Sequence, residues 1–443
     1  MQLKNDKKKP ITIIYQGKKT IVYPGQVIDG PVQLTIYGLT PITNQQAITV
    51  SFSESKKDTS SNNIKSIDET IKYIKSYNKG SLPSVAICIL SKDSYHLISD
   101  CLDSIETKVQ YPNTKVYVFD TGTTDQQTLS YYNSIKQSYK FNIEIIPVGE
   151  YHFSKNYNYG LKLVTADYYV IQNNDTVAIN DYISKLVRIA IVNKVGACGP
   201  RMLYKDGLIQ HDGQVLYDHQ SNGFGNPTHV NLRRNTKDVS AGIQTADGIT
   251  CAGMFVRSSV YWEAGGLNET YYDIFQDVEL NIKIRMNGHM IVCDRDALIH
   301  HYDNTSRNNF WANNIEKLKL KHLDYNYLYS KFNRDLTYFK RENKKISIVT
   351  LVSNEEQYIN FLEDLKNQDC SFDFEIIALP NFNNEYTGCA NALNIGMSLS
   401  ESEYIILCHQ DLRVPKNWLS NIFEKIKELK INDINFGVLG MAG

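Results

Sequence analysis

Long apolar runs are missing from this sequence. No stretch of about 18 apolar residues, the length needed to cross a bilayer, occurs among its 443 residues. The lysine-rich start also lacks the apolar core of a secretory signal peptide. These absences predict a cytoplasmic protein without a membrane-spanning helix.

An excess of charge of either sign is missing as well. The formal net charge is −1, with 42% hydrophobic and 21% charged residues, as in a soluble globular protein. A chain so close to neutrality has no general field that would attract nucleic acid or an anionic membrane. Nucleic acid is therefore not an expected partner.

The 8 cysteines lack the Cys-x-x-Cys spacing of zinc and redox sites. Four of them lie inside apolar runs, namely Cys88, Cys198, Cys293 and Cys408. We interpret these four as reduced core residues, because disulfides are rare in cytosolic proteins.

Composition changes several times along the chain and indicates its organisation. We predict a small β module (1–55), a linker and helix (56–82), an α/β domain (83–310), a helical connector (311–344) and a partial second α/β unit (345–443). The β module has β-like runs separated by Gly and Pro, at 11–15, 20–23, 32–37 and 47–52. It carries no catalytic constellation, so binding, oligomerisation and a passive structural role are all open.

Strands and helices alternate between residues 85 and 193. We expect strands at 85–90, 115–119, 143–148 and 168–172, and helices at 97–105, 128–140, 156–164 and 182–193. This order predicts a parallel sheet with helices on both faces. Asp120 and Asp175 follow two of these strands, so both are expected at the rim where such sheets bind ligands.

The stretch Asn173-Asn174-Asp175 is the centre of this pattern. A carboxylate at the carboxyl end of a parallel strand suits Mg²⁺ or Mn²⁺, which bind one or two carboxylates and leave other positions to water and phosphate. Asn-Asn-Asp is also ordinary turn chemistry. Taken alone, the stretch leaves both interpretations open.

The sequence changes character after residue 196. Residues 223–247 are polar and poor in aliphatic side chains, which predicts a loop or lid. We further expect a strand at 249–256, a helix at 271–287 that carries Asp277, and short strands at 290–293 and 297–299 that run into His300-His301. We interpret Arg201 as a surface arginine.

Residues 346–411 echo residues 85–175. Asn158-Tyr-Gly160 and Asn394-Ile-Gly396 are each followed by an apolar strand and, 15 residues after the glycine, by Asp175 or Asp411. The second copy stops at residue 443 and lacks the later part of the first. It is either a fragment or a structural unit, and a catalytically complete second domain is not expected.

With these motifs placed, residues 84–306 resemble family 2 glycosyltransferases of the GT-A fold, in the bacterial rhamnosyltransferase-like branch. The family's Asp-Asn-Gly-Ser-x-Asp resembles Asp120-Thr-Gly-Thr-Thr-Asp125, and its metal motif resembles Asn173-Asn174-Asp175. Leu90-Ser91-Lys-Asp93 stands at the family's first turn.

The later motifs follow in the family's order. Gln276-Asp277-Val-Glu-Leu280 resembles Glu-Asp-x-Asp-Leu, whose first Asp is the catalytic base, and His300-His301 match a late histidine. Gly199–Gly213, Gly253–Arg257 and Gly265–Glu269 match further family segments, and His409-Gln-Asp411 resembles the signature of a related domain. The sequence departs from the family at Gln276, where Glu is usual, and at Asn173, where many members have Asp.

The resemblance implies an α/β protein with a GT-A domain, Rossmann-like and built on a mostly parallel sheet. It implies sugar transfer from a nucleotide diphosphate sugar to an acceptor hydroxyl, with inversion, in bacterial surface polysaccharide or glycoconjugate synthesis. The implied base is Asp277, and the implied holders of Mn²⁺ or Mg²⁺ are Asp175, His301 and His300. The implied donor contacts are Ser91, Asp93, Asp120, Asp125, Asn173 and Asn174.

Bland alternatives accompany these roles. Asp125 could equally be the N-cap of the following helix, the histidine pair a polar turn, and Asp277 part of a solvated acidic face. The implied acceptor is a glycan or a lipid-linked glycan, and the latter would bring the protein to the membrane surface.

Two other functions compete. A nucleotidyltransferase would usually carry a glycine-rich phosphate loop after its first strand, and Leu90-Ser-Lys-Asp93 has none. A non-catalytic carbohydrate-binding or scaffold protein could retain the GT-A fold. The truncated second copy, Gln276 and Asn173 keep the second alternative open.

Overall fold

A computed structural model describes residues 2–4, 11–15, 18–22, 27–29, 40–41, 59–77, 81–135, 139–218, 223–271, 274–302, 328 and 346–431. The chain divides into two units, Met1–Thr59 and Ser60–Gly443. The predicted runs at 32–37 and 47–52 lie outside the described residues, as does the connector 311–344 apart from Leu328.

The N-terminal unit is antiparallel β structure, as predicted. Strand β1 (Gln2–Lys4) lies between β4 (Val27–Asp29) and β5 (Thr40–Pro41) and is antiparallel to both. Strands β2 (Ile11–Tyr15) and β3 (Lys18–Val22) form a hairpin.

The second unit is built on a 10-stranded sheet whose main path is β10-β17-β11-β16-β9-β6-β7-β8. Its strands are β6 (Val85–Ser91), β7 (Thr114–Asp120), β8 (Asn142–Pro147), β9 (Tyr168–Asn173), β10 (Thr176–Ala178), β11 (Val195–Leu203), β16 (Gly253–Arg257) and β17 (Met290–His301), with β12 (Ile209–His211) on β11 and β15 (Ile243–Ala246) on β17. The four predicted strands, β6 to β9, are mutually parallel where they pair.

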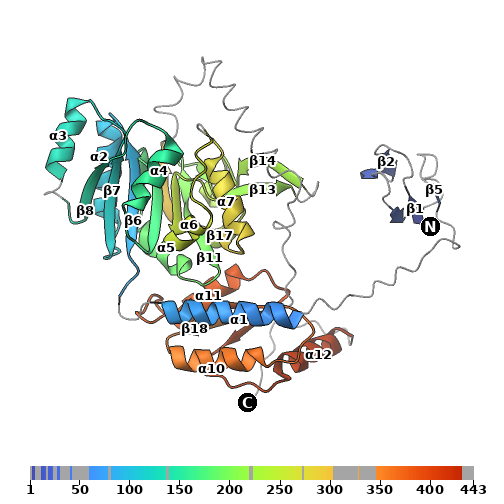
Figure 1. The fold of residues 1–443 in the computed structure, drawn as a ribbon. Helices are drawn as coiled ribbons and strands as arrows, with labels where there is room; N and C mark the ends of the chain where they lie inside the picture. Colours follow the sequence, from blue (N-terminus) through green and yellow to red (C-terminus); the bar gives the residue numbers. More distant parts are fainter. Residues whose placement is uncertain are drawn as a thin grey trace. The chain divides into compact units, whose positions relative to one another are not determined.

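Helices cover both faces of this sheet (Figure 1), which confirms the α/β prediction. On one face, strand residues such as Val85 and Ile87 pack with α2 (Tyr95–Lys108), α3 (Gln126–Ser134) and α5 (Tyr182–Ala190). On the other, Ala86 and Cys88 pack with α4 (Phe153–Lys162), α6 (Ser258–Glu263) and α7 (Gln276–Met286). Because successive strand residues point to opposite faces, two apolar layers require strands that are apolar throughout.

Three expectations for the later half need correction. Residues 223–247 are not simply a loop: they contain β14 (Gly223–His229), which pairs with β13 (Gln214–Asp218), a 3-10 turn (Thr236–Asp238) and β15 of the main sheet. The two short strands at 290–293 and 297–299 are one strand, β17, with a register shift against β11. Helix α7 begins at Gln276, not at 271.

The repeat forms a second, smaller parallel sheet. Strand β18 (Ile346–Val352) lies between β19 (Phe374–Pro380) and β20 (Tyr404–Cys408), as β6 lies between β7 and β9. Its helices are α10 (Glu355–Lys366), α11 (Cys389–Leu399) and α12 (Trp418–Ile431).

The Asn-x-Gly glycines have the same role in both sheets. A Cβ on Gly160 of α4 would lie 2.6 Å from ring atoms of Phe119 in β7. A Cβ on Gly396 of α11 would lie 2.2 Å from a methyl carbon of Val349 in β18. The repeated glycine is therefore explained by close approach of a helix to the sheet beneath it.

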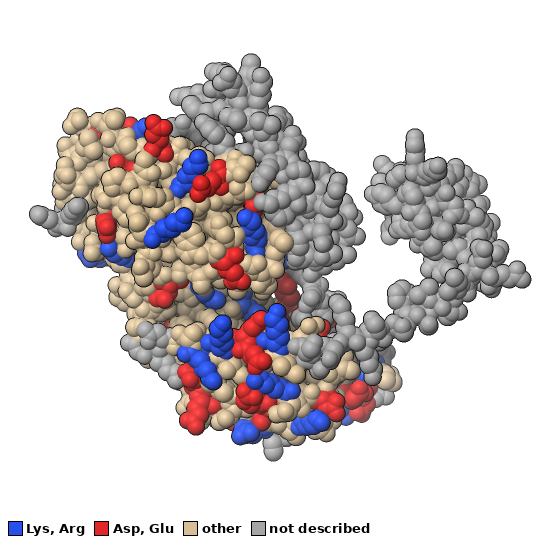
Figure 2. Space-filling model, in the orientation of Figure 1, with Lys and Arg blue, Asp and Glu red and all other residues tan. Residues whose placement is uncertain are grey.

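Helix α1 (Thr59–Ser76) packs into the core of the smaller sheet. Ile67, Ile71 and Ile74 pack in one cluster with Ile346 and Ile348 of β18. Its outer side is charged: Figure 2 shows Lys and Arg interspersed with Asp and Glu over this part of the molecule. On the face shown, no large area of one sign appears, in keeping with the near-neutral composition.

Cys88, Cys198 and Cys293 are buried and free of disulfides, as predicted, whereas Cys408 is free but partly exposed. Among the described residues, no helix is both long and apolar enough to span a membrane.

The close approach of α4 to β7 can be tested with Gly160→Val. The added side chain should overpack the contact with Phe119 and destabilise the protein by ~1–3 kcal/mol, lowering the Tm by at most about 2–4 °C per kcal/mol in thermal unfolding of a unit this large. The matched control is Tyr159→Val, which places the same side chain in the same helix at a position that is 53% exposed. Equal Tm values for the two variants would contradict the packing explanation.

Candidate functional site

The carboxyl ends of three parallel strands form the rim of the candidate site. In the sheet register, Ser91 of β6 lies opposite Asp120 of β7, and Leu90 lies opposite Asn173 of β9. The prediction that Asp120 and the Asn173-Asn174-Asp175 stretch share one rim is confirmed. Asn174 also donates a hydrogen bond from Nδ2 to Oγ of Ser91, at 3.3 Å, which ties the two strand ends together.

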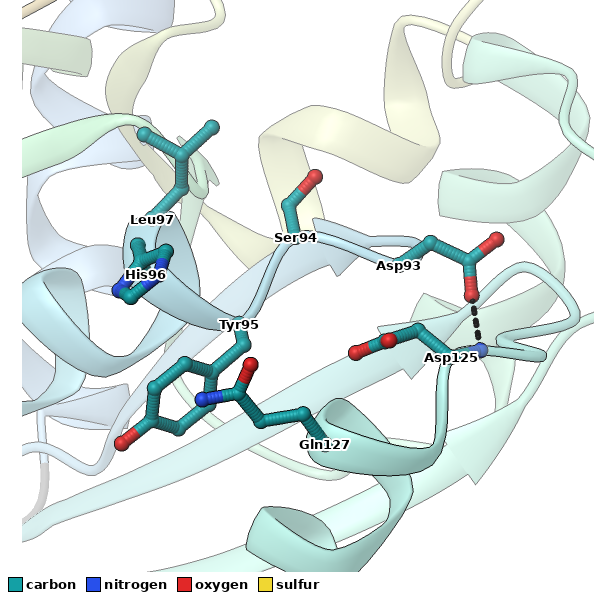
Figure 3. Close-up of a pocket in the computed structure, with 7 residues that line it drawn as sticks. All are labelled: Asp93, Ser94, Tyr95, His96, Leu97, Asp125 and Gln127. Carbon is teal, nitrogen blue, oxygen red and sulfur yellow. Dashed lines mark hydrogen bonds between the residues drawn. The ribbon is translucent and has the colours of Figure 1, made fainter.

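Asp93 ties the loop after β6 to the loop after β7. Its Oδ1 accepts hydrogen bonds from the backbone N–H groups of Thr124, at 2.5 Å, and Asp125, at 2.8 Å. Figure 3 shows the second of these. Hydrogen bonds from the Asp125 and Thr124 amides hold the pKa of Asp93 below its usual value. Asp93 has φ 46°, in the left-handed region that Asp tolerates better than most side chains.

Asp120 and Asp125 both organise the chain that follows them. Oδ1 of Asp120 accepts hydrogen bonds from the backbone N–H and the hydroxyl of Thr123. Asp125 is the N-cap of α3, where Oδ2 accepts from the N–H of Thr128 at 2.8 Å and its hydroxyl at 2.7 Å. The helix-cap alternative for Asp125 is thus confirmed, and the Thr128 hydrogen bonds lower its pKa.

An open pocket of about 300 Å³ lies beside these loops. Figure 3 shows it between the turn after β6 and the start of α3, with Asp93 and Asp125 at one end and Tyr95 and Gln127 at the other. Mostly polar residues, together with Tyr95 and Leu97, therefore line a cavity at the same end of the sheet as Asp120.

Asn174 and Asp175 form a tight turn between β9 and β10, so the turn interpretation is correct. Buried hydrogen bonds nevertheless anchor the turn. Gln172 is buried, donates a hydrogen bond to the Thr176 hydroxyl at 2.9 Å and accepts one from the Tyr182 hydroxyl at 2.6 Å. Asp175 is only 9% exposed. A rigid turn thus holds a largely buried carboxylate at the rim.

His301 lies directly against this carboxylate. Its Nε2 is 3.3 Å from Oδ1 of Asp175, and its Nδ1 is 2.8 Å from the side-chain oxygen of Gln210. Since that oxygen can only accept, Nδ1 carries the proton in the neutral ring, and Nε2 accepts from Asn173 Nδ2 at 3.3 Å. Nε2 of His301 therefore lies beside both the Asn173 amide and a carboxylate oxygen of Asp175.

His300 lies elsewhere. Its Nδ1 is 3.2 Å from the carbonyl oxygen of Tyr204, and its ring stacks on Tyr302. Neighbouring residues of a strand point to opposite faces, so only one of the two histidines can meet Asp175. Within the part of the chain that the structure describes, no cluster of three or more His, Cys, Asp or Glu side chains suits a metal ion. Asp175 and His301 therefore form a contact of two side chains and not a cluster of three.

Asp277 lies at the start of α7, after a strained residue. Phe275 has φ 67° and ψ 0°, a left-handed conformation that costs a bulky side chain about 1–3 kcal/mol. The Asp277 carboxylate is half-buried, and its Oδ2 accepts a hydrogen bond from Gln214 Nε2 at 3.3 Å. It is therefore a held carboxylate at a helix N-terminus and not a freely solvated one.

Several residues of this region were missed by sequence reasoning. Arg201 is buried, not on the surface: its Nε lies 2.9 Å from Oδ1 of Asp212, and Arg295 Nε lies 2.9 Å from Oδ2. His211 is fully buried, and among the described residues neither ring nitrogen has a hydrogen-bond partner. Burial, followed by the neighbouring His229 and His301, lowers the pKa of His211 well below its usual value, so it is neutral.

In α/β proteins, ligands bind at the carboxyl ends of parallel strands such as those that form this rim, and family comparison makes the class specific. A model described as glycosyltransferase like family 2 matches residues 83–319, more than half of the chain, so the chain belongs to that family. A second model, described as glycosyl transferase family 2, matches residues 381–435. This segment includes α11, β20 and α12 of the smaller sheet and its helices. These two matches confirm the predicted GT-A domain and the predicted partial second GT-A-like domain.

The chain is also similar to parts of two bacterial proteins. The chain is 25% identical over 264 residues to the uncharacterized protein y4gI of Sinorhizobium fredii, covering 59% of this chain and 28% of that one. It is 23% identical over 250 residues to the O-antigen biosynthesis protein RfbC of Myxococcus xanthus, covering 54% and 19%. The chain therefore spans less than a third of the length of these relatives.

Solved structures with partial similarity include GalNAc-T7 with UDP, GalNAc and Mn²⁺, at a TM-score of 0.41 and 10% identity over 50% of this chain and 44% of that one. Another is the mannosyltransferase PcManGT of Pyrobaculum calidifontis with GDP-Man and Mn²⁺, at a TM-score of 0.37 and 13% identity over 58% and 70%. The fold assignment rests on the sheet and the family match.

The buried ion group predicts a large effect of Asp212→Asn. Removing this charge leaves two buried arginines without their shared partner, which should cost ~3–5 kcal/mol of unfolding free energy in a urea titration. Asp206→Asn is the matched control, because Asp206 pairs with Arg233 at the surface, where side chains are 51% and 61% exposed, and should cost less than ~1 kcal/mol. Similar losses for both variants would contradict the proposed importance of burial.

Proposed function

We propose that this glycosyltransferase moves a sugar from a nucleotide diphosphate sugar to an acceptor hydroxyl with inversion at the anomeric carbon. The observation that carries the proposal is the pairing of Asp175 with His301 at the strand rim, together with a separately held carboxylate, Asp277. The Asp175–His301 pair suits the diphosphate end of a donor. The Asp277 carboxylate suits a base that takes the proton of an acceptor hydroxyl. Both lie in the segment matched by the family.

The donor site proposed here uses the rim and its loops. Asp120 and Asp93 would meet the nucleoside, beside the pocket that contains Tyr95. Ser91, Asn173 and Asn174 border the turn where the diphosphate would lie, and Asp125 contributes through the helix it caps. These roles follow the family motifs, and the geometry supports them by placing the residues at one end of the sheet.

The residues at Asp175 fit a divalent metal. A carboxylate oxygen, the ligand type that suits Mg²⁺ and Mn²⁺, lies 3.3 Å from an imidazole nitrogen that could bind beside it. Neighbouring ligands of an octahedral Mg²⁺ or Mn²⁺ site, at about 2.1 Å each, are about 3 Å apart. His301 and Asp175 would hold the ion, and phosphate and water would complete its shell. His300 is left out because its ring faces Tyr204.

Bound there, a divalent metal would neutralise charge on the diphosphate leaving group. The chain's own part in the reaction is proton transfer and orientation. As the acceptor oxygen attacks the anomeric carbon, the bond from that carbon to the diphosphate oxygen breaks and its electron pair leaves with the nucleoside diphosphate. Asp277 takes the proton of the attacking hydroxyl. A single base on the face opposite the leaving group gives inversion, through an oxocarbenium-like transition state.

The biological setting proposed is synthesis of a bacterial surface polysaccharide or glycoconjugate in the cytoplasm. The O-antigen biosynthesis relative supports it. The acceptor would be a glycan or a lipid-linked glycan, and a lipid-linked acceptor would bring the protein to the membrane surface. Assembly through the N-terminal β module is a separate proposal, tested by the solution mass of a chain lacking residues 1–55.

A second candidate function is a non-catalytic carbohydrate-binding or scaffold protein. It is favoured by Asn173, whose amide already occupies Nε2 of His301, and by Gln276 beside the base position. Hydrolysis of a nucleotide sugar that depends on metal distinguishes the two, because a scaffold would show none.

Replacing the base should separate chemistry from binding. Asp277→Asn is expected to lower transfer by ~10²–10⁴-fold, because the attacking hydroxyl loses its proton acceptor, while the Kd for donor stays within about twofold of wild type. The rate is measured by release of nucleoside diphosphate, and NMR of the product gives its anomeric configuration. Asp238→Asn, at an exposed position, is the control. Normal turnover by Asp277→Asn would remove this residue from the mechanism.

Metal binding is tested without turnover. Electron paramagnetic resonance of free Mn²⁺ should give a Kd, with nucleoside diphosphate present, that rises at least about tenfold in Asp175→Asn because a charged oxygen ligand is lost. Asp100→Asn changes an exposed acidic residue and should leave the Kd unchanged. Equal binding by all three proteins would place the metal elsewhere.

A further inference from the structure

One short segment contacts both halves of the candidate site. Gln210 in β12 reaches His301, and Gln214 in β13 reaches Asp277. Both glutamines are buried, at 3% and 4% exposure. Buried amide side chains need hydrogen-bond partners, and here each one finds a partner in a residue that the proposed mechanism uses.

The Gln214 amide is held in one orientation. Its Oε1 accepts from Nδ2 of Asn281 at 3.4 Å, which directs its Nε2 to the Asp277 carboxylate. Asn281 is fully buried, one turn after Asp277 on α7, and donates to the Asp277 carbonyl oxygen at 2.8 Å. Gly248 leaves room for this arrangement, because a Cβ there would lie 2.6 Å from Gln214 Oε1.

The Gln210 amide acts on the other half. Its oxygen accepts a hydrogen bond from Nδ1 of His301, which leaves Nε2 on the side of Asp175. A hydrogen bond of this kind commonly sets the tautomer and ring orientation of a metal-binding histidine.

The segment between the two glutamines is itself fixed. Asp212 is fully buried between Arg201 and Arg295 and accepts a further hydrogen bond from Asn231 Nδ2 at 2.7 Å. Gly213 follows with φ 99°, which lets the chain turn from one glutamine to the next. Movement of one glutamine is therefore restricted by the same anchor that restricts the other.

We propose that Gln210 and Gln214 are positioning residues: Gln210 orients His301 toward the donor's diphosphate end, and Gln214 orients the carboxylate of Asp277 toward the acceptor. The inference rests on the proposed function and deepens it. It assigns the segment 209–214 the task of holding the two reacting sides in register, without contact of either glutamine with substrate.

The two variants should fail in different ways. Gln210→Leu is expected to raise the Kd for Mn²⁺ by about 10–100-fold, as for other partners of metal-binding histidines, and transfer should recover at saturating Mn²⁺. Gln214→Leu should leave the Mn²⁺ and donor Kd values unchanged and lower kcat at least tenfold at every Mn²⁺ concentration. Gln244→Leu, an exposed glutamine on neighbouring β15, is the matched control and should change neither.

A pH profile tests whether the side chain at position 214 faces the base. In Gln214→Glu, a second carboxylate beside Asp277 should raise the pKa of the base. The acidic limb of kcat/KM, which depends on ionised base, should then move to higher pH. The buried thiol of Cys251, which lies near Asp277, stays protonated because burial raises its pKa. An acidic limb that stays at its wild-type pH would show that position 214 does not face the base and would overturn the role of Gln214.

The results distinguish the inference from the function beneath it. Transfer at the wild-type rate by Gln214→Leu, or unchanged Mn²⁺ affinity in Gln210→Leu, would overturn the corresponding half while the proposed function stands. Parallel loss of Tm, metal binding and kcat in both leucine variants would reduce the glutamines to structural support. A wild-type protein that transfers no sugar from any donor would overturn the proposed function and the positioning roles together.

Discussion

The parallel pairing of β6 with β7 on one side and β9 on the other is the constraint on which the rest of the second unit depends. It brings Ser91 level with Asp120 and Leu90 level with Asn173, so chain segments far apart in sequence end at one rim. The strands can be parallel because helices return the chain across both faces, and those helices require apolar residues on each side of the central strands. The packing of the core therefore determines which residues come together at the rim.

The second half of the site comes from antiparallel structure added to this frame. Strand β16 lies between β9 and β11, and β17 continues the sheet until His301 meets the Asp175 turn. The segment 209–218 then spans the distance to α7, where Asp277 follows the strained Phe275. Buried polar residues hold this half: Asp212 neutralises two arginines, and Asn281 and Gln214 satisfy each other. Its precision depends on polar networks that are complete only in the folded chain.

The sequence predicted the parts of the fold that depend on periodicity. Apolar strands at 85–90 and 168–172 and the repeated Asn-x-Gly unit were recognisable because one residue pattern decides each. It did not predict that Arg201 is buried, because its partner Asp212 is brought near only by a strand pair. The sequence could not decide which of His300 and His301 contacts Asp175. Strand alternation places the two histidines on opposite faces, but the register of the strand decides which of them faces the Asp175 turn. Gln210 and Gln214 have no periodic signal at all, and their roles depend on contacts with residues about 60 to 90 positions later.

The measurement that tests the central claim most directly is a thermal-shift panel of nucleoside diphosphates and nucleotide sugars, each with and without Mn²⁺, on wild type and Asp175→Asn. A ligand that binds only the folded state raises the Tm according to its affinity. The account predicts a shift with one nucleotide class that requires Mn²⁺ and is lost in the variant. No shift with any nucleotide, or an equal shift in both proteins, would contradict a donor site at the Asp175 rim.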